Sequence, residues 1–450
     1  MSERSLLAKY SGAVPRYTSY PTAPHFHEGV NCDIYAQWLG ELSERDTLSL
    51  YVHIPYCDRL CWFCACHTKH TLKYEPISNY LKPLFKEIAT VGARVSKTAK
   101  VTALHFGGGS PTMLTPEDMI AIMNAFRAAF TFAVDAEISV EMDPNDLDEA
   151  RYDGLAAIGM TRASLGVQDF DPKVQKTINR LQTFEQTKGV ADAVRARGVH
   201  SVNCDILYGL PFQTQETLRA TVRDIISLSP DRIALFGYAH VPWMKKHQTL
   251  IPEHALPNVD ERYAQMKMAA AMLLEAGYEA IGIDHFAKPD DRLAIAARTG
   301  KLRRNFQGYT DDQATALIGF GASSIGQLPQ GYVQNMVATG EYERMANQDG
   351  LTVVRGIALT DDDRMRAHVI ERIMCDFAFD FAPLRERFPA LADTVIAEAR
   401  HFAASNPDAL CRVDPLGFRL TERGQALARS VAAVFDAYLG NGKGRHSIAV

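Results

Sequence analysis

Short hydrophobic segments rich in β-branched and aromatic residues alternate with amphipathic segments from Leu48 onward. The first kind is typical of buried strands, and the second carries apolar residues at helical spacing. The alternation predicts an α/β chain whose parallel strands are covered by helices. Periodicity does not distinguish a doubly wound sheet from a full or partial barrel. The predicted strands are LSLYVHIP (48–55), KVTALHFG (100–107), EISVEMDP (137–144), TRASLGVQ (161–168), SVNCDILYG (201–209) and DRIALFGYA (231–239). A further strand-like run is YEAIGIDHFA (278–287).

The pattern changes at both ends of the chain. Residues 1–47 contain the turn-rich run PRYTSYPTAPHF, which indicates an N-terminal extension rather than a core strand. Such a segment is either a lid over the functional face or a strap that packs against a domain. After about residue 351 helical patterns dominate, with a hairpin-like segment at 413–424. We therefore predict an N-terminal extension (1–47), an α/β domain (48–350) and a small helical C-terminal domain (351–450).

Composition and charge narrow the class of protein. The chain is 47% hydrophobic and 22% charged, which is typical of a globular protein. Its 48 basic residues against 53 acidic ones give a net charge of -5, which argues against sequence-independent binding of nucleic acid. We find neither a signal-peptide pattern nor an apolar run approaching the ~20 residues that span a bilayer. We expect a cytoplasmic protein with no membrane span.

Four of the eight cysteines are clustered at positions 57, 61, 64 and 66. Cys57, Cys61 and Cys64 follow a predicted strand, so one loop could present three thiols to an iron–sulfur cluster. Three thiolate ligands leave the fourth iron of a 4Fe-4S cluster open to another ligand. The main alternative is a structural zinc site that includes Cys66, because zinc prefers four sulfur or nitrogen ligands. The pair of separate C-x-x-C motifs typical of zinc sites is missing.

A second candidate lies at the end of the next predicted strand, in the run GGGSPT (107–112). Glycines let a ligand approach the backbone closely, although a tight strand-to-helix turn also explains them. Polar residues then recur at the ends of later strands, where ligands bind in open α/β sheets. One such acid is commonly a helix cap, but several on neighbouring strands favour a ligand site. They are Glu141, Gln168, Asp205 and the pair Ala239-His240.

The spacing Cys57-x-x-x-Cys61-x-x-Cys64, with Phe63 before the last cysteine, resembles the motif of the radical S-adenosylmethionine superfamily. The resemblance implies that S-adenosylmethionine chelates the open iron and is cleaved to a 5'-deoxyadenosyl radical, which abstracts hydrogen from carbon. It also implies that the run at 107–109 holds the methionyl amine. The cofactor supplies the difficult step, and the protein supplies binding and orientation.

Within this superfamily the chain resembles the oxygen-independent coproporphyrinogen III oxidases over nearly its whole length. That resemblance implies a partial (β/α)6-type barrel, one 4Fe-4S cluster and two bound S-adenosylmethionine molecules. The segments that carry it are PRYTSYPTA (15–23), LYVHIPYC (50–57), CWFCACH (61–67), LHFGGGSPT (104–112), EISVEMDP (137–144), GVQDF (166–170), NRLQ (179–182), DILYGLP (205–211), FGYAH (236–240), DHFAKPDD (284–291) and NFQGYT (305–310).

The resemblance also assigns residues to the cofactors. Cys57, Cys61 and Cys64 would bind the cluster. The first S-adenosylmethionine would contact Tyr51, Gly108, Glu141 and Ile325, with Tyr51 and Glu141 as the catalytic pair. The second would contact Phe63, Gly109, Ser110, Gln168, Arg180, Asp205 and Ala239. By its position alone, Arg180 would be interpreted as a surface charge. Ser110 and Trp62 stand where the family often has Thr and Tyr, which are mild departures.

The implied reaction is the oxidative decarboxylation of two propionates of coproporphyrinogen III to vinyl groups, which gives protoporphyrinogen IX. It requires an electron donor for the cluster and an electron acceptor, and we expect a monomer. The substrate has four carboxylates, for which Arg16, Arg303 and Arg304 are candidate partners. The alternatives are a haem chaperone or a haem-degrading radical methyltransferase of the same superfamily, or a zinc-stabilised binding module. PRYTSYPTA and Cys66 favour the oxidase over the chaperone.

Overall fold

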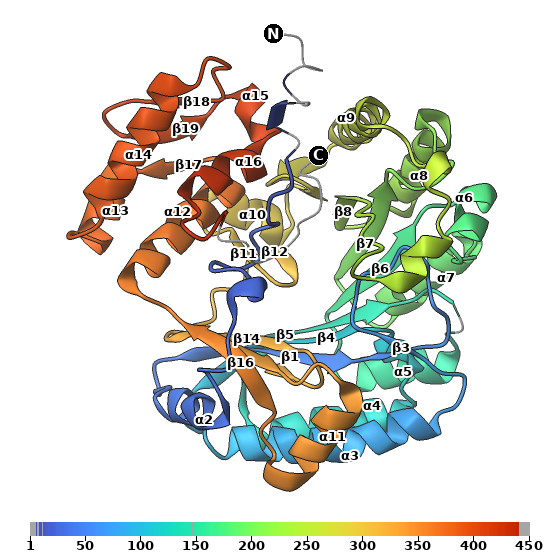
Figure 1. Cartoon of the computed structure of the whole chain (residues 1–450). Coiled ribbons are helices and arrows are strands. Elements are labelled where there is room, and N and C mark those ends of the chain that lie inside the picture. Colours follow the sequence, from blue (N-terminus) through green and yellow to red (C-terminus); the bar gives the residue numbers. More distant parts are fainter. Residues whose placement is uncertain (1–5, 7–8, 11, 146, 441–450) are drawn as a thin grey trace.

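The computed structural model describes residues 6, 9–10, 12–145 and 147–440 (Figure 1). Its largest feature is a twelve-stranded sheet in the order β16-β15-β14-β13-β1-β4-β5-β6-β7-β8-β10-β9. The central strands pair in parallel throughout, so their carboxyl ends lie along one edge. These strands are β13 (Ala316–Phe320), β1 (Thr47–Ile54), β4 (Lys100–Gly108), β5 (Thr131–Met142), β6 (Arg162–Gln168), β7 (Ser201–Tyr208) and β8 (Arg232–Gly237).

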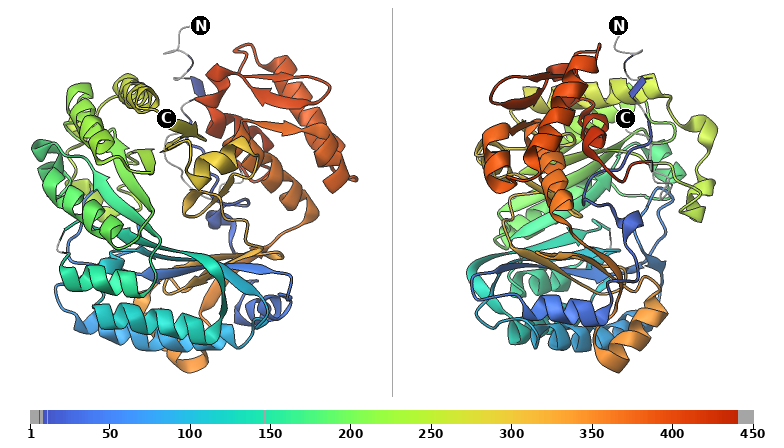
Figure 2. Two further views of the ribbon diagram at one scale, coloured as in Figure 1. Left: turned by 180° about the vertical axis from the view of Figure 1, so that it is seen from behind. Right: turned by 60° about the vertical axis from the view of Figure 1, so that its left-hand side comes forward.

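Helices cover the outer face of this curved sheet, as Figures 1 and 2 show. Threonine N-caps start three of them: the Thr115, Thr183 and Thr214 side chains each accept a backbone N–H of the first turn. The predicted partial barrel with outer helices is therefore confirmed. The helices are α3 (Glu75–Gly92), α4 (Pro116–Ala129), α5 (Glu149–Ala157), α6 (Pro172–Thr177), α7 (Phe184–Ala196), α8 (Gln215–Leu228) and α9 (Val259–Glu275).

Antiparallel strands extend both edges of the parallel sheet. β14 (Ile325–Leu328), β15 (Gly331–Asn335) and β16 (Val353–Ala358) follow β13 on one side. On the other side, the single strand expected at 278–287 is instead a hairpin of β9 (Glu279–Ile281) and β10 (His285–Ala287). Gly282 lies between them with a φ of 56°, a conformation that glycine adopts readily.

The C-terminal unit (361–440) combines helices with a small sheet in the order β17-β19-β18. The hairpin expected near 413–424 is present as β18 and β19. The division of the chain into three domains remains a prediction, and β16 belongs to the large sheet although it lies beyond residue 350. The elements are α12 (Asp361–Asp376), β17 (Ala378–Asp380), α13 (Phe381–Arg387), α14 (Ala392–Ser405), β18 (Cys411–Val413), β19 (Gly417–Leu420), α15 (Glu422–Gln425) and α16 (Ala428–Ala432).

Smaller elements complete the fold. Helix α2 (Cys32–Gly40) lies near β16, and α11 (Thr339–Asp349) packs against α3. Helix α10 (Arg292–Arg298) follows β10, and β11 (Arg303–Asn305) pairs with β12 (Gly308–Thr310). Among the described helices, none is long and apolar enough to cross a membrane.

The N-terminal segment (12–26) packs into the core of the C-terminal unit. Tyr17 and Tyr20 are buried in the same hydrophobic cluster as Phe418 and other C-terminal side chains. The Tyr17 hydroxyl donates to Asp436 at 3.0 Å, and the Tyr20 hydroxyl accepts the Ala437 amide at 2.9 Å. Figures 1 and 2 show the segment running beside the C-terminal unit before the chain enters the sheet. This packing supports the strap interpretation of the extension.

We predict that Tyr20→Ala destabilises the C-terminal unit by about 3–5 kcal/mol, because the substitution leaves a cavity in an aromatic core. Hydrogen exchange of the α12 and α16 amides measures the effect. Tyr20→Phe is the control, because it keeps the ring and loses one hydrogen bond, at a cost of about 1 kcal/mol. If these amides keep wild-type protection from exchange in Tyr20→Ala, the strap interpretation of the N-terminal extension is contradicted.

Candidate active site at the carboxyl edge of the sheet

The cysteine motif lies on a closed loop at the end of β1. The short strands β2 (Tyr56–Cys57) and β3 (Lys69–His70) pair with each other and join the two ends of the loop. The Lys69 amide donates to the Pro55 carbonyl at 2.6 Å, and the Thr71 amide donates to the Cys57 carbonyl at 2.9 Å. Residues 58–68 are therefore held at both ends beside the carboxyl edge of the sheet.

Side chains from distant segments bind the backbone of this loop. Gln248 Nε2 and His247 Nε2 lie 2.9 Å and 2.7 Å from the carbonyl oxygens of Phe63 and Cys64. On the other side, Asn179 Nδ2 donates to the Leu60 carbonyl at 2.9 Å. These contacts give three of the loop carbonyls hydrogen-bond partners from other parts of the chain.

The three motif cysteines are free thiols close to one another. Burial raises the pKa of Cys57, and the neighbouring Cys64 and Cys61 raise it further because clustered thiolates repel one another. Such a group needs a cationic partner, and iron is the usual one for three thiolates on a single loop. Among the described residues no His, Cys, Asp and Glu group is arranged around a single metal ion. Three thiols on one loop fit a 4Fe-4S cluster, in which each thiolate binds its own iron.

Arg180 is a buried residue of this site and not a surface charge. Its Nη1 lies 2.9 Å from Asp143 Oδ2 and 3.7 Å from Cys61 Sγ. The Arg180 side chain also donates to the Gly166 carbonyl at 2.5 Å. One guanidinium therefore connects the cysteine loop to the ends of β5 and β6. The sequence analysis missed Asp143, whose position directly after a strand was the available signal.

The glycines at 107–109 bring β4 into close contact with its neighbours. A Cβ on Gly109 would lie 2.5 Å from the Tyr56 carbonyl oxygen, and one on Gly107 would lie 2.9 Å from Glu141 Oε1. Gly108 has a φ of 111°, and its amide donates to Glu141 Oε2 at 3.0 Å. A side chain at position 107 would push β4 away from Glu141, and one at position 109 would push it away from Tyr56, the residue before Cys57.

Glu141 and Tyr51 lie beside this contact. His105 Nε2 donates to Glu141 Oε1 at 3.1 Å, and the Tyr51 ring stacks on His105 with 5.8 Å between centroids. Burial alone would raise the pKa of Glu141, but the hydrogen bonds from His105 and Gly108 hold it below its usual value. The carboxylate is therefore ionised near neutral pH and suits a cationic or hydroxyl-bearing ligand.

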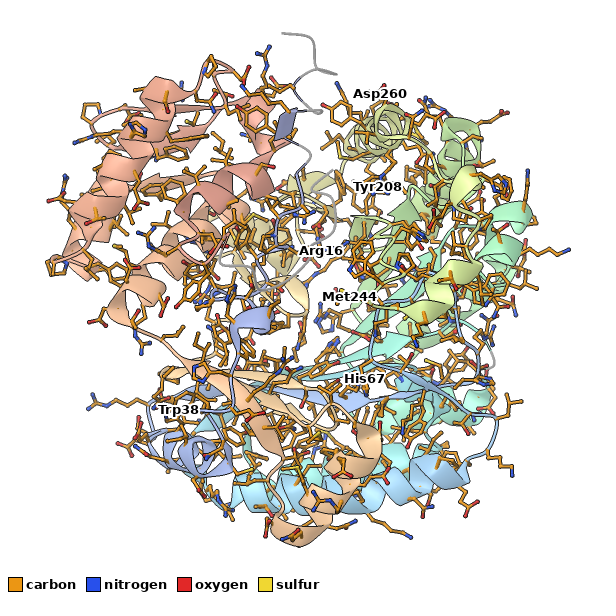
Figure 3. The ribbon with its side chains drawn as sticks, viewed as in Figure 1. Arg16, Trp38, His67, Tyr208, Met244 and Asp260 are labelled. Atoms are coloured by element: carbon orange, nitrogen blue, oxygen red, sulfur yellow. The ribbon has the colours of Figure 1, made fainter. Side chains whose placement is uncertain are left out.

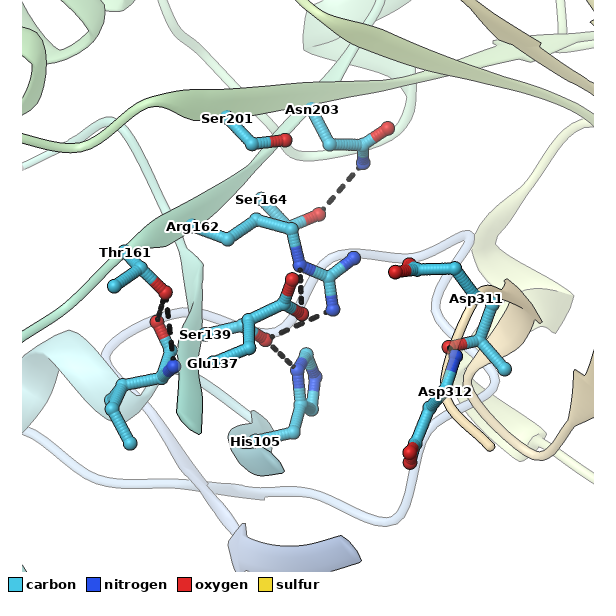
Figure 4. A network of polar contacts seen from close by, with 12 residues as sticks. His105, Glu137, Ser139, Thr161, Arg162, Ser164, Ser201, Asn203, Asp311 and Asp312 are labelled. Carbon is cyan, nitrogen blue, oxygen red and sulfur yellow. Dashed lines mark hydrogen bonds and ion pairs between the residues drawn. The ribbon is translucent and has the colours of Figure 1, made fainter. Parts of the chain in front are cut away.

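A polar network fills the inner face of the neighbouring strands (Figure 4). His105 contacts Ser139, Arg162 lies 3.0 Å from Glu137, and Asn203 donates to Ser164 at 2.8 Å. Asn203 also donates to Asp205 at 2.8 Å, while burial raises the pKa of Asp205. The sequence analysis overlooked most of this network. The signal was present in polar residues at every second position of each strand, since alternate residues face the same side.

The other predicted residues lie on several elements of the sheet and on the cysteine loop. Gln248 Nε2 donates to the carbonyls of both Phe63 and Ala239, which brings β8 to the loop. Ser110 follows Gly109, and its hydroxyl contacts that of Thr112 at 3.0 Å. Gln168 ends β6 with a φ of 71°. Ile325 begins β14, and its carbonyl lies against Gly319, the residue paired with Tyr51.

Comparison with known proteins gives the family. The Radical SAM superfamily profile matches residues 51–225. The oxygen-independent coproporphyrinogen III oxidase of Bradyrhizobium diazoefficiens is 47% identical over 437 residues, which cover 97% of each chain. That of Escherichia coli K12 is 39% identical, covering 97% of this chain and 95% of its own. The chain belongs to the oxygen-independent coproporphyrinogen III oxidase family. Its relatives match it from the N-terminal strap to the C-terminal unit.

A solved structure supports the same conclusion. Coproporphyrinogen III oxidase from Escherichia coli, described as a Radical SAM enzyme, superposes with a TM-score of 0.90 at 38% identity. The match covers 94% of this chain and 98% of that one. Membership of this oxidase family implies a 4Fe-4S cluster and S-adenosylmethionine, which fit the thiol loop and the carboxyl edge described above.

We predict that Gly109→Ala prevents full cluster loading, because the added methyl group must displace the Tyr56 backbone next to Cys57. Iron analysis and visible absorbance after anaerobic reconstitution measure the loss. Gly189→Ala is the matched control: a Cβ there meets nothing within 4 Å, and alanine in helix α7 stabilises by about 0.5–1 kcal/mol. Normal iron content in Gly109→Ala would show that the close approach is dispensable.

Proposed function

We propose that this chain converts coproporphyrinogen III to protoporphyrinogen IX without oxygen, by oxidative decarboxylation of two propionate side chains. The observation that carries the proposal is the near-full-length match to this oxidase family, together with three free thiols on one loop at the carboxyl edge of the sheet. Each propionate loses one hydrogen atom, CO2 and one electron to become a vinyl group.

Cys57, Cys61 and Cys64 would hold the 4Fe-4S cluster. When bound, the cluster and S-adenosylmethionine supply a 5'-deoxyadenosyl radical that abstracts the hydrogen atom. Tyr51, Gly108, Glu141 and Ile325 would contact the first S-adenosylmethionine, with Glu141 held ionised by His105. The cluster needs an external electron donor, and the electron left after loss of CO2 needs an acceptor. We also propose that the enzyme is a cytoplasmic monomer.

A second S-adenosylmethionine would occupy the other side of the cysteine loop. Its proposed contacts lie on the cysteine loop, directly after β4, on β6 and β7, and in the segments that follow β6 and β8. Asp205 suits ribose hydroxyls there, since Asn203 orients its carboxylate. Two bound molecules would supply one radical for each propionate. The proposed set is Phe63, Gly109, Ser110, Gln168, Arg180, Asp205 and Ala239.

The anaerobic, reconstituted protein should convert coproporphyrinogen III when given S-adenosylmethionine and a low-potential reductant, with vinyl products detected by chromatography. Cys57→Ser, Cys61→Ser and Cys64→Ser should each lose the cluster and turnover, since each removes one ligand. Cys66→Ser is the matched control and should keep the cluster. A brown protein that binds haem without converting the substrate would instead indicate a chaperone.

We predict that substitution of Glu141 impairs cleavage of S-adenosylmethionine, whereas substitution of Asp205 impairs its binding. The two residues lie on β5 and β7, with β6 between them. Equilibrium dialysis should find two S-adenosylmethionine molecules per wild-type chain. Asp205→Ala should weaken one of them by roughly tenfold to a hundredfold, as expected for loss of a buried hydrogen-bonded group. Glu141→Ala should lose cleavage at the cluster.

The exposed Glu117 on α4 provides the control, and Glu117→Gln should bind two molecules with wild-type affinity. One bound molecule in the wild type would exclude the two-site arrangement, whatever the variants show.

A further inference from the structure

A cavity of about 560 Å³ lies beside the carboxyl end of β8. Three parts of the chain enclose it: the end of the sheet with α9, the N-terminal segment, and α16 of the C-terminal unit. Gly237, Tyr238 and Ala239 line its inner wall, so it adjoins the proposed site of the second S-adenosylmethionine. Figure 3 labels two lining residues from different parts, Arg16 and Tyr208, in this central region. We call it the arginine cavity, because four arginines line it.

Four arginines from four separate segments line this cavity: Arg16, Arg262, Arg304 and Arg429. They come from the N-terminal segment, α9, β11 and α16 respectively. Among the described lining residues the one carboxylate is Asp284, which also lies 2.7 Å from His285 Nδ1. Positive charge therefore exceeds negative charge in the arginine cavity.

Backbone carbonyls hold these guanidinium groups in place. Arg16 donates to the Gly237 carbonyl at 3.3 Å, and Arg304 donates to the Arg16 carbonyl at 3.3 Å. Arg429 donates to the carbonyls of Val14 and Pro15 at 2.6 Å and 3.3 Å. A neutral carbonyl orients the guanidinium of Arg16 or of Arg304 without cancelling its charge. Elsewhere in the chain, buried Arg232 pairs with Asp291 at 2.8 Å.

The cluster has unused hydrogen-bonding capacity. Within the described part of the chain, Arg262 Nε and Arg304 Nη1 are buried without a hydrogen-bond partner. Burial, with Arg16 and Arg304 nearby, lowers the pKa of Arg429 to about 10. Burial and then Arg16 likewise lower the pKa of Arg262. Buried donors that repel one another are typical of a site whose anionic ligand completes it.

The remaining lining is mostly apolar. Trp243, Leu256, Pro257, Met266 and Leu427 contribute large hydrophobic surfaces, and the Trp243 side chain remains 44% exposed. A pocket with apolar walls and a few convergent charged groups suits a flat or bowl-shaped hydrophobic ligand with acidic substituents.

We propose that the arginine cavity binds the tetrapyrrole substrate through its propionates, with Arg16, Arg262, Arg304 and Arg429 as the carboxylate partners. This inference rests on the proposed function and names the substrate-binding residues. A guanidinium binds a carboxylate through two parallel hydrogen bonds, so four arginines match four propionates in number and chemistry. Arg303, a candidate from the sequence, instead pairs with Glu371 at 2.8 Å and does not line this cavity.

The number of carboxylates should then control affinity. The substrate has four propionates and the product keeps two, so conversion removes two of the four partners. The enzyme would hold its product less tightly than its substrate. This preference needs no movement of the protein, because it follows from the loss of ligand charge alone.

The test uses the full-length, reconstituted protein under anaerobic conditions. Coproporphyrin III, the aromatic form with the same four propionates, is titrated by fluorescence, with its tetramethyl ester and protoporphyrin IX as comparison ligands. Coproporphyrin III should bind at least about tenfold more tightly than protoporphyrin IX, and its affinity should fall as the salt concentration rises. The neutral ester should bind weakly and without salt dependence.

Arg262→Gln and Arg429→Gln should each weaken coproporphyrin III binding about tenfold or more and raise the KM for coproporphyrinogen III. Arg262→Lys should recover part of the affinity, because lysine keeps the positive charge but cannot form the bidentate hydrogen bonds of arginine. Iron content and the thermal midpoint report folding, which matters for Arg429 because it also holds the N-terminal segment. Arg344→Gln, on the exposed face of α11, is the matched control and should behave as wild type.

Unchanged affinity in both folded glutamine variants, or an equal loss for the tetramethyl ester, would overturn the cavity assignment. The two proposals fail in different ways. A protein that binds coproporphyrin III through these arginines but does not convert coproporphyrinogen III refutes the proposed function alone. A protein that converts it while both variants keep wild-type KM and affinity refutes the cavity alone.

Discussion

The close approach of Gly107 and Gly108 to the side chains of Glu141 and His53, and of Gly109 to the backbone of Tyr56, is the constraint on which the site depends. It brings the end of β4 against Glu141 on one side and against the strand before Cys57 on the other. Only residues without a side chain allow both contacts at once. The thiol loop and the carboxylate that would serve one cofactor are thereby joined through a single stretch of main chain.

Parallel pairing extends this local constraint across the sheet. Because every central strand ends at the same edge, the parallel order brings Glu141, Gln168, Asp205 and Ala239 onto, or just beyond, neighbouring strands although they are far apart in sequence. Polar side chains at alternate positions then reach into the barrel and orient one another, as Asn203 does for Asp205. The two sides of the loop differ in charge environment, since Glu141 is held ionised while burial opposes ionisation of Asp205.

The sequence predicted the parts of the molecule that follow from local patterns. Hydrophobic runs located six of the seven parallel strands, all but β13, and the cysteine spacing located the loop. Local patterns do not predict long-range ion pairs. By its position alone Arg180 was interpreted as a surface charge, because nothing nearby in sequence indicates Asp143 or Cys61, and only the family resemblance assigned it to the site. The same holds for the arginine cavity, whose residues 16, 262, 304 and 429 come together only in the folded chain. The strand expected at 278–287 is divided by a turn at Gly282, which has a positive φ, and the glycine itself was a local signal for that turn.

The burial of Tyr17 and Tyr20 among C-terminal side chains has a consequence for biosynthesis. These tyrosines leave the ribosome long before their partners Asp436 and Ala437, which lie 419 and 417 positions later in the chain. The large sheet contains its own hydrophobic core and can fold during translation, but the second core cannot be completed until Asp436 and Ala437 have been made.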